Sequence, residues 1–168
     1  MIDHERLKNF LIELIKIDSL SRREYDVAMR LKREIEDLGG SVFIDDAGEK
    51  VGGNVGNLIA KFPGNNGKAQ PLLLSAHMDT VVPGEGIVPI LDGDILRTNG
   101  KTVLGGDDKS GVAIICEVLR VIKDHRLPCG PVDVVFTICE EAGLVGARCL
   151  DIGKLRALIP DEIWQHRD

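Results

Sequence analysis

Hydrophobic and polar positions along the chain predict three amphipathic helices. Apolar residues recur at helical spacing over residues 4–17, 21–38 and 109–125, so each range has one face suited to burial. Ser21 and Glu24 stand three positions apart, as in a capping box, and predict that the second helix begins at Ser21.

Shorter apolar runs between these helices predict strands. The expected strands cover 41–44, 56–62, 71–77 and 132–138, and a hairpin is expected over 87–97. The run Leu72-Leu73-Leu74 is apolar on both faces, which predicts a central strand covered by helices on both sides. Because helices and strands alternate, the fold class is α/β.

Composition narrows the function classes. The chain has 168 residues, of which 43% are hydrophobic, enough for one buried core. Its 27 acidic side chains exceed the 21 basic ones and give a net charge of −6, which disfavours nucleic acid and anionic membranes as partners. The 4 cysteines form no C-x-x-C pair, so we expect reduced, mostly buried thiols.

The sequence also indicates where the protein works. Its apolar stretches are far shorter than the roughly 20 residues that span a bilayer. Residues 1–5 carry acid where a secretory signal needs a basic flank and an apolar stretch. We therefore expect a cytoplasmic protein.

Three clusters of chemically active side chains follow predicted strands or precede a helix. They are His77 with Asp79, Asp107 with Asp108, and Glu140 with Glu141. Each cluster alone has an ordinary explanation. The His-x-Asp pair could be incidental, the aspartates could cap the third helix, and the glutamates could be solvated loop charges.

Taken together, the clusters point to metal chemistry. All three lie where a parallel-type sheet gathers its strand ends, the usual place for a site in such folds. Imidazole and carboxylate ligands suit Zn²⁺, Mn²⁺ or Co²⁺, and a pair of such ions activates water and polarises a carbonyl. A further carboxylate must then take the proton of the water, and Glu140 or Glu141 is available for that step.

The ordered segments 77–81, 105–109 and 140–141 resemble the signature of the M20 metallopeptidases, most closely their peptidase T-like (tripeptidase) branch. The resemblance extends from the first helix to about residue 155 and includes Asp45-Asp46 and the stretch 53–57. It implies a three-layer α/β/α sheet of the zinc-peptidase type, incomplete at the C-terminus.

The resemblance also implies roles for individual residues. His77 would bind one metal, Asp107 would bridge two metals, and Glu141 would bind the other. Asp79 would orient His77, and Glu140 would act as general base and acid. The peptide bond that follows the bridging aspartate would be cis. Two Zn²⁺ ions are expected, with Mn²⁺ or Co²⁺ as possible replacements.

The chain departs from this family at its C-terminal end. Family members are longer, with an inserted lid domain and further metal ligands downstream. We expect residues 1–155 to be the N-terminal part of a catalytic domain and 156–168 a divergent polar tail, with the lid and dimerisation domain absent. Asp161, Glu162 and His166 of this tail are not expected to be ligands.

The function predicted is metal-dependent hydrolysis of peptide bonds, with aminopeptidase action on short peptides. A deacylase or carboxypeptidase of the same family is one alternative. Another is a catalytically silent fragment that binds metal or self-associates through an unpaired sheet edge. A nucleotide-binding module is disfavoured, because the only glycine-rich candidate, 103–108, lacks both phosphate-loop patterns and carries two aspartates.

Overall fold

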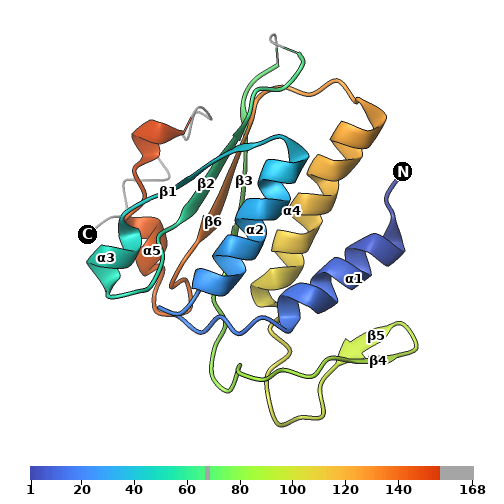
Figure 1. Cartoon of the computed structure of the whole chain (residues 1–168), viewed down its shortest axis with the longest axis vertical. Coiled ribbons are helices and arrows are strands. Elements are labelled where there is room, and N and C mark those ends of the chain that lie inside the picture. Colours follow the sequence, from blue (N-terminus) through green and yellow to red (C-terminus); the bar gives the residue numbers. More distant parts are fainter. Residues whose placement is uncertain (67–68, 156–168) are drawn as a thin grey trace.

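A mixed sheet lies at the centre of the structure, a computed structural model that describes residues 1–66 and 69–155 (Figure 1). Its strand order is β1-β2-β6-β3. β3 and β6 run parallel, whereas β1 with β2 and β2 with β6 run antiparallel. The strands are β1 (Ser41–Ile44), β2 (Leu58–Phe62), β3 (Leu72–His77) and β6 (Val132–Thr137).

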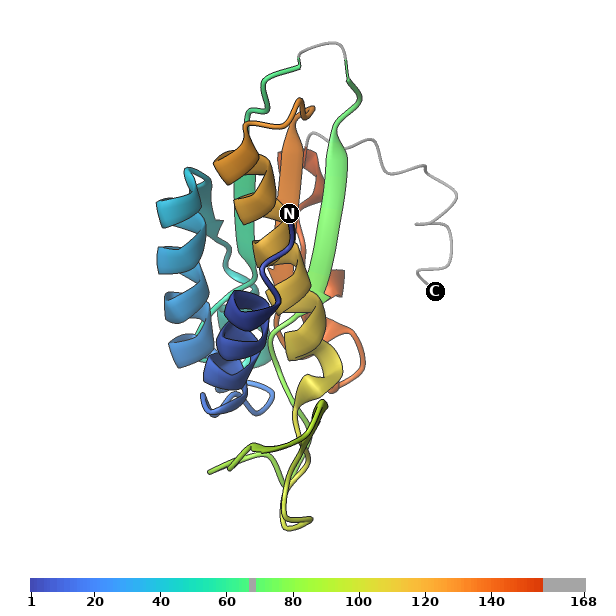
Figure 2. The same cartoon turned by 90° about the vertical axis from the view of Figure 1, so that its right-hand side faces the viewer.

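Three long helices cover one face of this sheet (Figure 2). They are α1 (His4–Ile15), α2 (Tyr25–Leu38) and α4 (Gly106–His125). Two short helices, α3 (Ala47–Val51) and α5 (Val145–Arg148), contact each other and are followed by the 3-10 turn Ile152–Lys154. The hairpin of β4 (Ile90–Asp92) and β5 (Ile95–Arg97) projects beyond one end of the sheet (Figures 1 and 2).

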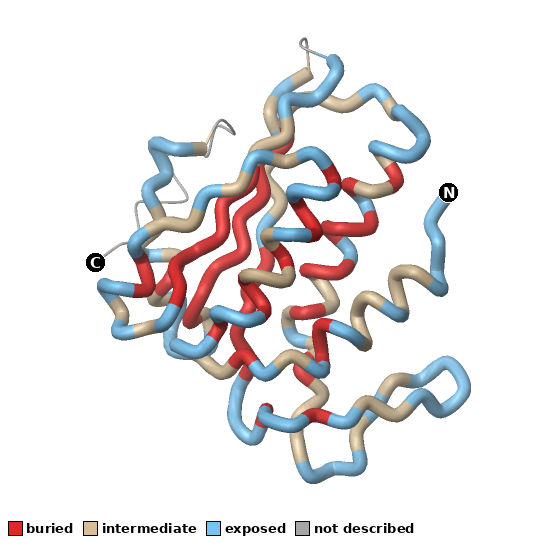
Figure 3. The backbone as a smooth tube through the Cα atoms, viewed as in Figure 1, coloured by how far each residue is buried: buried red, intermediate tan, exposed pale blue. Residues whose placement is uncertain are grey.

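The core lies between the three helices and the sheet (Figure 3). Alternate residues of β2 and β6, such as Leu58, Val134 and Phe136, point into it and are fully buried. β6 is buried along its whole length, because it has a strand on each side. Since this core fixes β6 and β3 against α4, it also fixes the ends of those elements.

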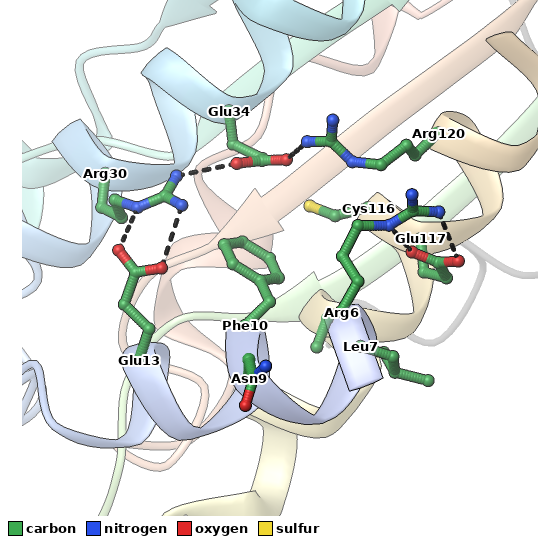
Figure 4. A pocket seen from close by; sticks show the side chains of 11 residues that line it. Arg6, Leu7, Asn9, Phe10, Glu13, Arg30, Glu34, Cys116, Glu117 and Arg120 are labelled. Carbon is green, nitrogen blue, oxygen red and sulfur yellow. Dashed lines mark hydrogen bonds and ion pairs between the residues drawn. The ribbon is translucent and has the colours of Figure 1, made fainter. Parts of the chain in front are cut away.

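Ion pairs join the three helices on their outer side (Figure 4). Arg6, Arg30 and Arg120 line a pocket between these helices, and each of them contacts a glutamate of another helix. Arg30 also lies over the ring of Phe10, at 4.8 Å from its centroid, and this contact ties α2 to α1. The pairs are Arg30 with Glu13 and Glu34, Arg120 with Glu34, and Arg6 with Glu117.

The structure corrects three predictions. α2 begins at Tyr25, and its N-cap Glu24 makes no capping hydrogen bond, so the predicted capping box from Ser21 is wrong. Within the described residues β3 is an edge strand, with Leu72 54% exposed, rather than a central one. The turn-rich stretch after β1 contains α3, which the sequence pattern did not predict because it is a single short turn rich in glycine and charge.

The short helix α5 and the 3-10 turn Ile152–Lys154 were not predicted either. The remaining elements agree with the prediction to within a few residues, and Asp3 accepts the capping hydrogen bond from the N–H of Arg6. None of the helices in 1–66 and 69–155 combines the length and apolar character that a membrane span requires. Asp161, Glu162 and His166 lie outside the described residues.

Candidate metal centre

The end of β3, the start of α4 and the loop after β6 meet at one end of the sheet. His77 is the last residue of β3, and Asp107 is the second residue of α4. Because β6 runs parallel to β3, with Thr137 opposite His77, the loop after β6 brings Glu141 to the same end. The hydrophobic core therefore sets the positions from which these three side chains project.

His77, Asp107 and Glu141 form a cluster that could hold a metal ion. One ligand atom from each, an imidazole nitrogen or a carboxylate oxygen, lies within 4.8 Å of the other two. His77 is buried, whereas both carboxylates are exposed, so the cluster opens to solvent on one side. Nitrogen and oxygen donors of this kind suit Zn²⁺ and similar ions.

The imidazole of His77 is oriented through its Nδ1 atom. This atom lies 3.0 Å from the backbone carbonyl oxygen of Asp79 and 3.3 Å from the Oδ1 atom of the same residue. Because a carbonyl oxygen only accepts hydrogen bonds, Nδ1 carries the proton. The Nε2 atom then faces the open side, 3.1 Å from Asp107 Oδ1 and 3.8 Å from Glu140 Oε2.

The charge around His77 favours a cation at this position. Burial opposes protonation, but the hydrogen bonds with Asp79 and Asp107 outweigh it and raise the pKa of His77 to about 9. At neutral pH the imidazole therefore carries a proton on both of its nitrogens, and three carboxylates surround it. A metal ion that replaces the proton on Nε2 would meet the same negative surroundings.

Asp79 is fully buried and accepts several hydrogen bonds. Burial alone would raise its pKa, but its hydrogen bonds with His77, the Ser21 hydroxyl and the N–H groups of Glu140 and Glu141 lower it. Ser21 Oγ donates at 2.6 Å, Glu140 N at 2.9 Å and Glu141 N at 3.1 Å. Asp79 therefore orients both the imidazole and the backbone that carries the two glutamates.

The two adjacent aspartates at the start of α4 have different surroundings. Asp108 Oδ1 accepts a hydrogen bond from the N–H of Gly111 at 3.0 Å, so it fulfils the capping role. Asp107 has non-helical backbone angles, and its side chain is 86% exposed toward the open side of the cluster. The peptide bond between the two aspartates is cis, as the resemblance implied.

The two glutamates after β6 also differ. Partial desolvation raises the pKa of Glu141, and the neighbouring carboxylates of Asp107, Glu140 and Asp79 raise it further, against the opposing charge of His77. A carboxylate in such surroundings gains from a nearby cation. Glu140 is 35% exposed and is not one of the three clustered ligands.

Three polar residues that support this centre were not predicted from the sequence. Ser21 and Glu24 had a pattern that suggested a helix cap, but their side chains turn toward Asp79 and Cys139 instead. Asn57, in the glycine-rich stretch before β2, accepts a hydrogen bond from the N–H of Ile138. Nothing in the local pattern separated Asn57 from an ordinary turn residue.

Two solved peptidase structures share this fold. An aminopeptidase PepT from Bacillus cereus superposes with a TM-score of 0.90 at 39% identity, over 93% of this chain and 42% of its own. A tripeptidase from Staphylococcus aureus superposes with a TM-score of 0.86 at 37% identity, over 94% of this chain and 42% of its own. The fold places this chain in the same class of peptidases.

The chain belongs to peptidase family M28, whose family model matches residues 57–151. It is also 32% identical to peptidase T from Parabacteroides distasonis over 85% of the chain and 35% of that relative. Protein YqjE of Bacillus subtilis, described as uncharacterized, is 37% identical over 94% of the chain and 42% of its own length. The chain thus spans less than half the length of the relatives it matches.

Proposed function

We propose that this chain carries the metal-binding part of a peptidase T-like aminopeptidase, which acts on short peptides. The observation that carries the proposal is the meeting of His77, Asp107 and Glu141 within 4.8 Å. Relatives described as peptidase T, tripeptidase and aminopeptidase support the peptide substrate and the finer branch.

In this proposal His77 holds one Zn²⁺ ion, Asp107 bridges two ions and Glu141 holds the other. Mn²⁺ or Co²⁺ would fit the same donor atoms. When bound, the metal pair polarises the scissile carbonyl and activates water. The protonated Nδ1 of His77 leaves Nε2 as the ligand atom, and Asp79 keeps the ring in that tautomer.

Glu140 is the proposed general base and acid. Its Oε2 atom lies 3.8 Å from His77 Nε2, so it reaches the ligand cluster without belonging to it. A base must stand within hydrogen-bond reach of the proton that it removes. The hydrogen bond from its N–H to Asp79 fixes the backbone from which this side chain projects.

Zinc titration and peptide cleavage test the proposal together. We expect the purified chain to bind Zn²⁺, and His77→Ala and Glu141→Gln to lose most of that affinity, because each removes a ligand atom. Glu36→Gln removes an exposed carboxylate of α2 and serves as the control. A chain that binds no zinc, or His77→Ala and Glu36→Gln variants that bind it equally, would contradict the proposed site.

Tripeptide hydrolysis then separates a working enzyme from a silent fragment. Turnover that is abolished by a chelator and by Glu140→Gln supports hydrolysis by this chain. An N-acylated amino acid in the same assay tests the deacylase alternative.

One observation favours the alternative of a fragment that self-associates. Among the described residues β3 pairs only with β6, and Leu72 on β3 is 54% exposed. An open strand edge can pair with a strand of another chain. Zinc binding without turnover, together with a dimer in sedimentation experiments, would favour this alternative over the isolated enzyme.

A further inference from the structure

The segment between α1 and α2, residues 19–24, lies against the candidate metal centre. Leu20 forms a parallel bridge with Thr80, and the N–H of Thr80 donates to the carbonyl oxygen of Ser19 at 2.9 Å. Ser21 Oγ donates to Asp79 Oδ2 at 2.6 Å. This segment therefore contacts the residues that follow His77.

Glu24 extends the same contact to the loop after β6. Its side chain is fully buried, and its Oε1 atom accepts hydrogen bonds at 3.0 Å from the N–H groups of Arg22 and Cys139. The Cys139 thiol lies 3.5 Å from the same oxygen. Cys139 is the residue immediately before Glu140, so Glu24 contacts the backbone that carries the two glutamates.

The loop 138–141 is held through four successive backbone N–H groups. Each of them donates to an oxygen of a side chain that is fully buried and comes from a distant part of the chain. The N–H of Ile138 donates to Asn57 Oδ1 at 3.0 Å, and the N–H of Cys139 donates to Glu24 Oε1 at 3.0 Å. The N–H groups of Glu140 and Glu141 donate to the two oxygens of Asp79, Oδ1 at 2.9 Å and Oδ2 at 3.1 Å.

This loop needs such support because of its backbone conformation. Cys139 has a φ of +51°, in the left-handed region that side chains other than glycine rarely adopt. Residues in this region keep their conformation only when the surrounding structure holds them. The acceptor of the Cys139 N–H is Glu24, so this carboxylate acts at the residue whose conformation is least favoured.

A purely structural role explains Glu24 poorly. A buried carboxylate loses its hydration, and burial raises the pKa of Glu24. Its Oε2 atom has no hydrogen-bond partner among the described residues, and the side chain does not cap α2. An apolar residue of similar size would fill this space without the cost of desolvation.

We propose that Glu24 is a positioning residue, which fixes the 138–141 loop so that Glu141 and Glu140 face His77. The inference rests on the proposed function for the reason that the loop must be held in place. The hydrogen bond between Glu24 and the N–H of Cys139 does not depend on that function. Glu24 does not touch the clustered ligand atoms, and acts through the N–H of Cys139.

Amide hydrogen exchange and Co²⁺ titration of the full 168-residue chain test this inference. Glu24→Met keeps the side-chain volume and removes the acceptor, whereas Glu24→Gln keeps an acceptor oxygen. We expect Glu24→Met to accelerate exchange at the amides of 139–141 and to weaken Co²⁺ binding, each by at least about tenfold. Glu24→Gln should restore both to within about threefold of the unchanged chain.

Glu117→Met is the matched control. It makes the same change at another buried carboxylate, which is 6% exposed and whose hydrogen bonds go to Asp3 and Arg6 at the start of α1. It should lower overall stability and leave the exchange of the 139–141 amides and Co²⁺ binding unchanged. If Glu24→Met and Glu117→Met behave alike in both measurements, the inference is wrong.

The two proposals fail in different ways. A chain that binds no Co²⁺, but whose 139–141 amides exchange faster in Glu24→Met, contradicts the metal site and supports the positioning of the loop. Co²⁺ binding that is insensitive to Glu24→Met contradicts the positioning role and leaves the metal site standing. If Glu24→Met does not fold, fast exchange of the 139–141 amides in the unchanged chain overturns the inference.

Discussion

The Oδ1 atom of Asp79 accepts a hydrogen bond from the N–H of Glu140 at 2.9 Å, although the two residues are 61 positions apart. The same carboxylate lies 3.3 Å from the ring of His77. One buried side chain therefore sets the relative positions of an imidazole on one strand end and the glutamates after another. Asp79 therefore links the proposed metal ligand His77 to the loop after β6.

Asp79→Ala should weaken both folding and metal binding. It leaves the N–H groups of Glu140 and Glu141 without their acceptor, and we expect a loss of about 3 kcal/mol in the free energy of unfolding. Zinc affinity should fall by about 10- to 100-fold, because His77 also loses its orientation. Urea unfolding and calorimetric titration measure the two effects. Asp79→Asn, which keeps one acceptor oxygen, should be intermediate; equal losses in both variants would argue against this account.

The stability of the metal-free chain should depend on the protonation of His77. Its pKa is raised from 6.5 to about 9 in the folded state, so folding favours the protonated form. The stabilisation is fully present below pH 6.5 and is lost as the pH rises through about 9. Comparing urea unfolding of the unchanged chain and His77→Gln across this range, with a chelator present, isolates the effect.

Lys109 makes this comparison with His77→Gln necessary. Burial lowers the pKa of its fully buried amine from 10.5 to about 8, so Lys109 destabilises the folded chain below about pH 8, and this destabilisation is relieved as the pH rises toward 10.5. The unchanged chain and His77→Gln share Lys109, so the difference between their free energies of unfolding does not contain its contribution. A difference between them that does not change with pH would contradict the assigned surroundings of His77.

The ion pair of Arg6 with Glu117 should stabilise the contact of α1 with α4. Two hydrogen bonds of 2.8 Å join the groups, and they lower the pKa of Glu117. Because Arg6 is 35% exposed and remains hydrated without its partner, Glu117→Gln should cost about 1–2 kcal/mol. A double-mutant cycle with Arg6→Gln measures the coupling, and a value near zero would contradict it. The contribution should be fully present above the normal pKa of a glutamate, about 4.5, and should be lost as the pH falls through the lowered pKa of Glu117 in the folded chain.

Gly146→Ala should destabilise the loop after β6. A Cβ atom at this position would lie 2.0 Å from the carbonyl oxygen of Ile138 and 2.9 Å from Asn57 Oδ1. We expect a loss of roughly 2–3 kcal/mol in the free energy of unfolding, since backbone must move to relieve the clash. Gly53→Ala is the control, because its Cβ would meet its neighbours at 3.5 Å or more. Thermal unfolding of both variants decides, and equal melting temperatures would contradict this packing.

Two of the four cysteines should resist alkylation while the chain is folded. Burial raises the pKa of Cys116 to about 12 and that of Cys139 to about 11. Cys129 and Cys149 are only partly buried and should react with iodoacetamide at least about tenfold faster. Peptide mass spectrometry after timed labelling measures the four rates. Rapid labelling of Cys116 in the folded chain would contradict its burial in the core.

Local patterns in the sequence are enough to locate most helices and strands of this protein. Helical spacing located α1 and most of α4, and apolar runs located β1, β3 and β6, because burial of one face or of a whole strand leaves a periodic trace in the sequence. The three acidic and imidazole clusters were visible because they are polar groups at the borders of apolar segments. Two of them follow predicted strands, and the third precedes the helix α4.

How these pieces support one another depends on the folded chain as a whole. The pairing order placed β3 at the edge of the described sheet, which a run of three leucines could not reveal, since apolar residues on both faces do not specify neighbours. Glu24 fits a capping pattern by spacing alone, yet its partner is the N–H of Cys139, 115 positions away. Hydrogen bonds between distant segments depend on how the chain returns to the same place, and no local periodicity encodes that return.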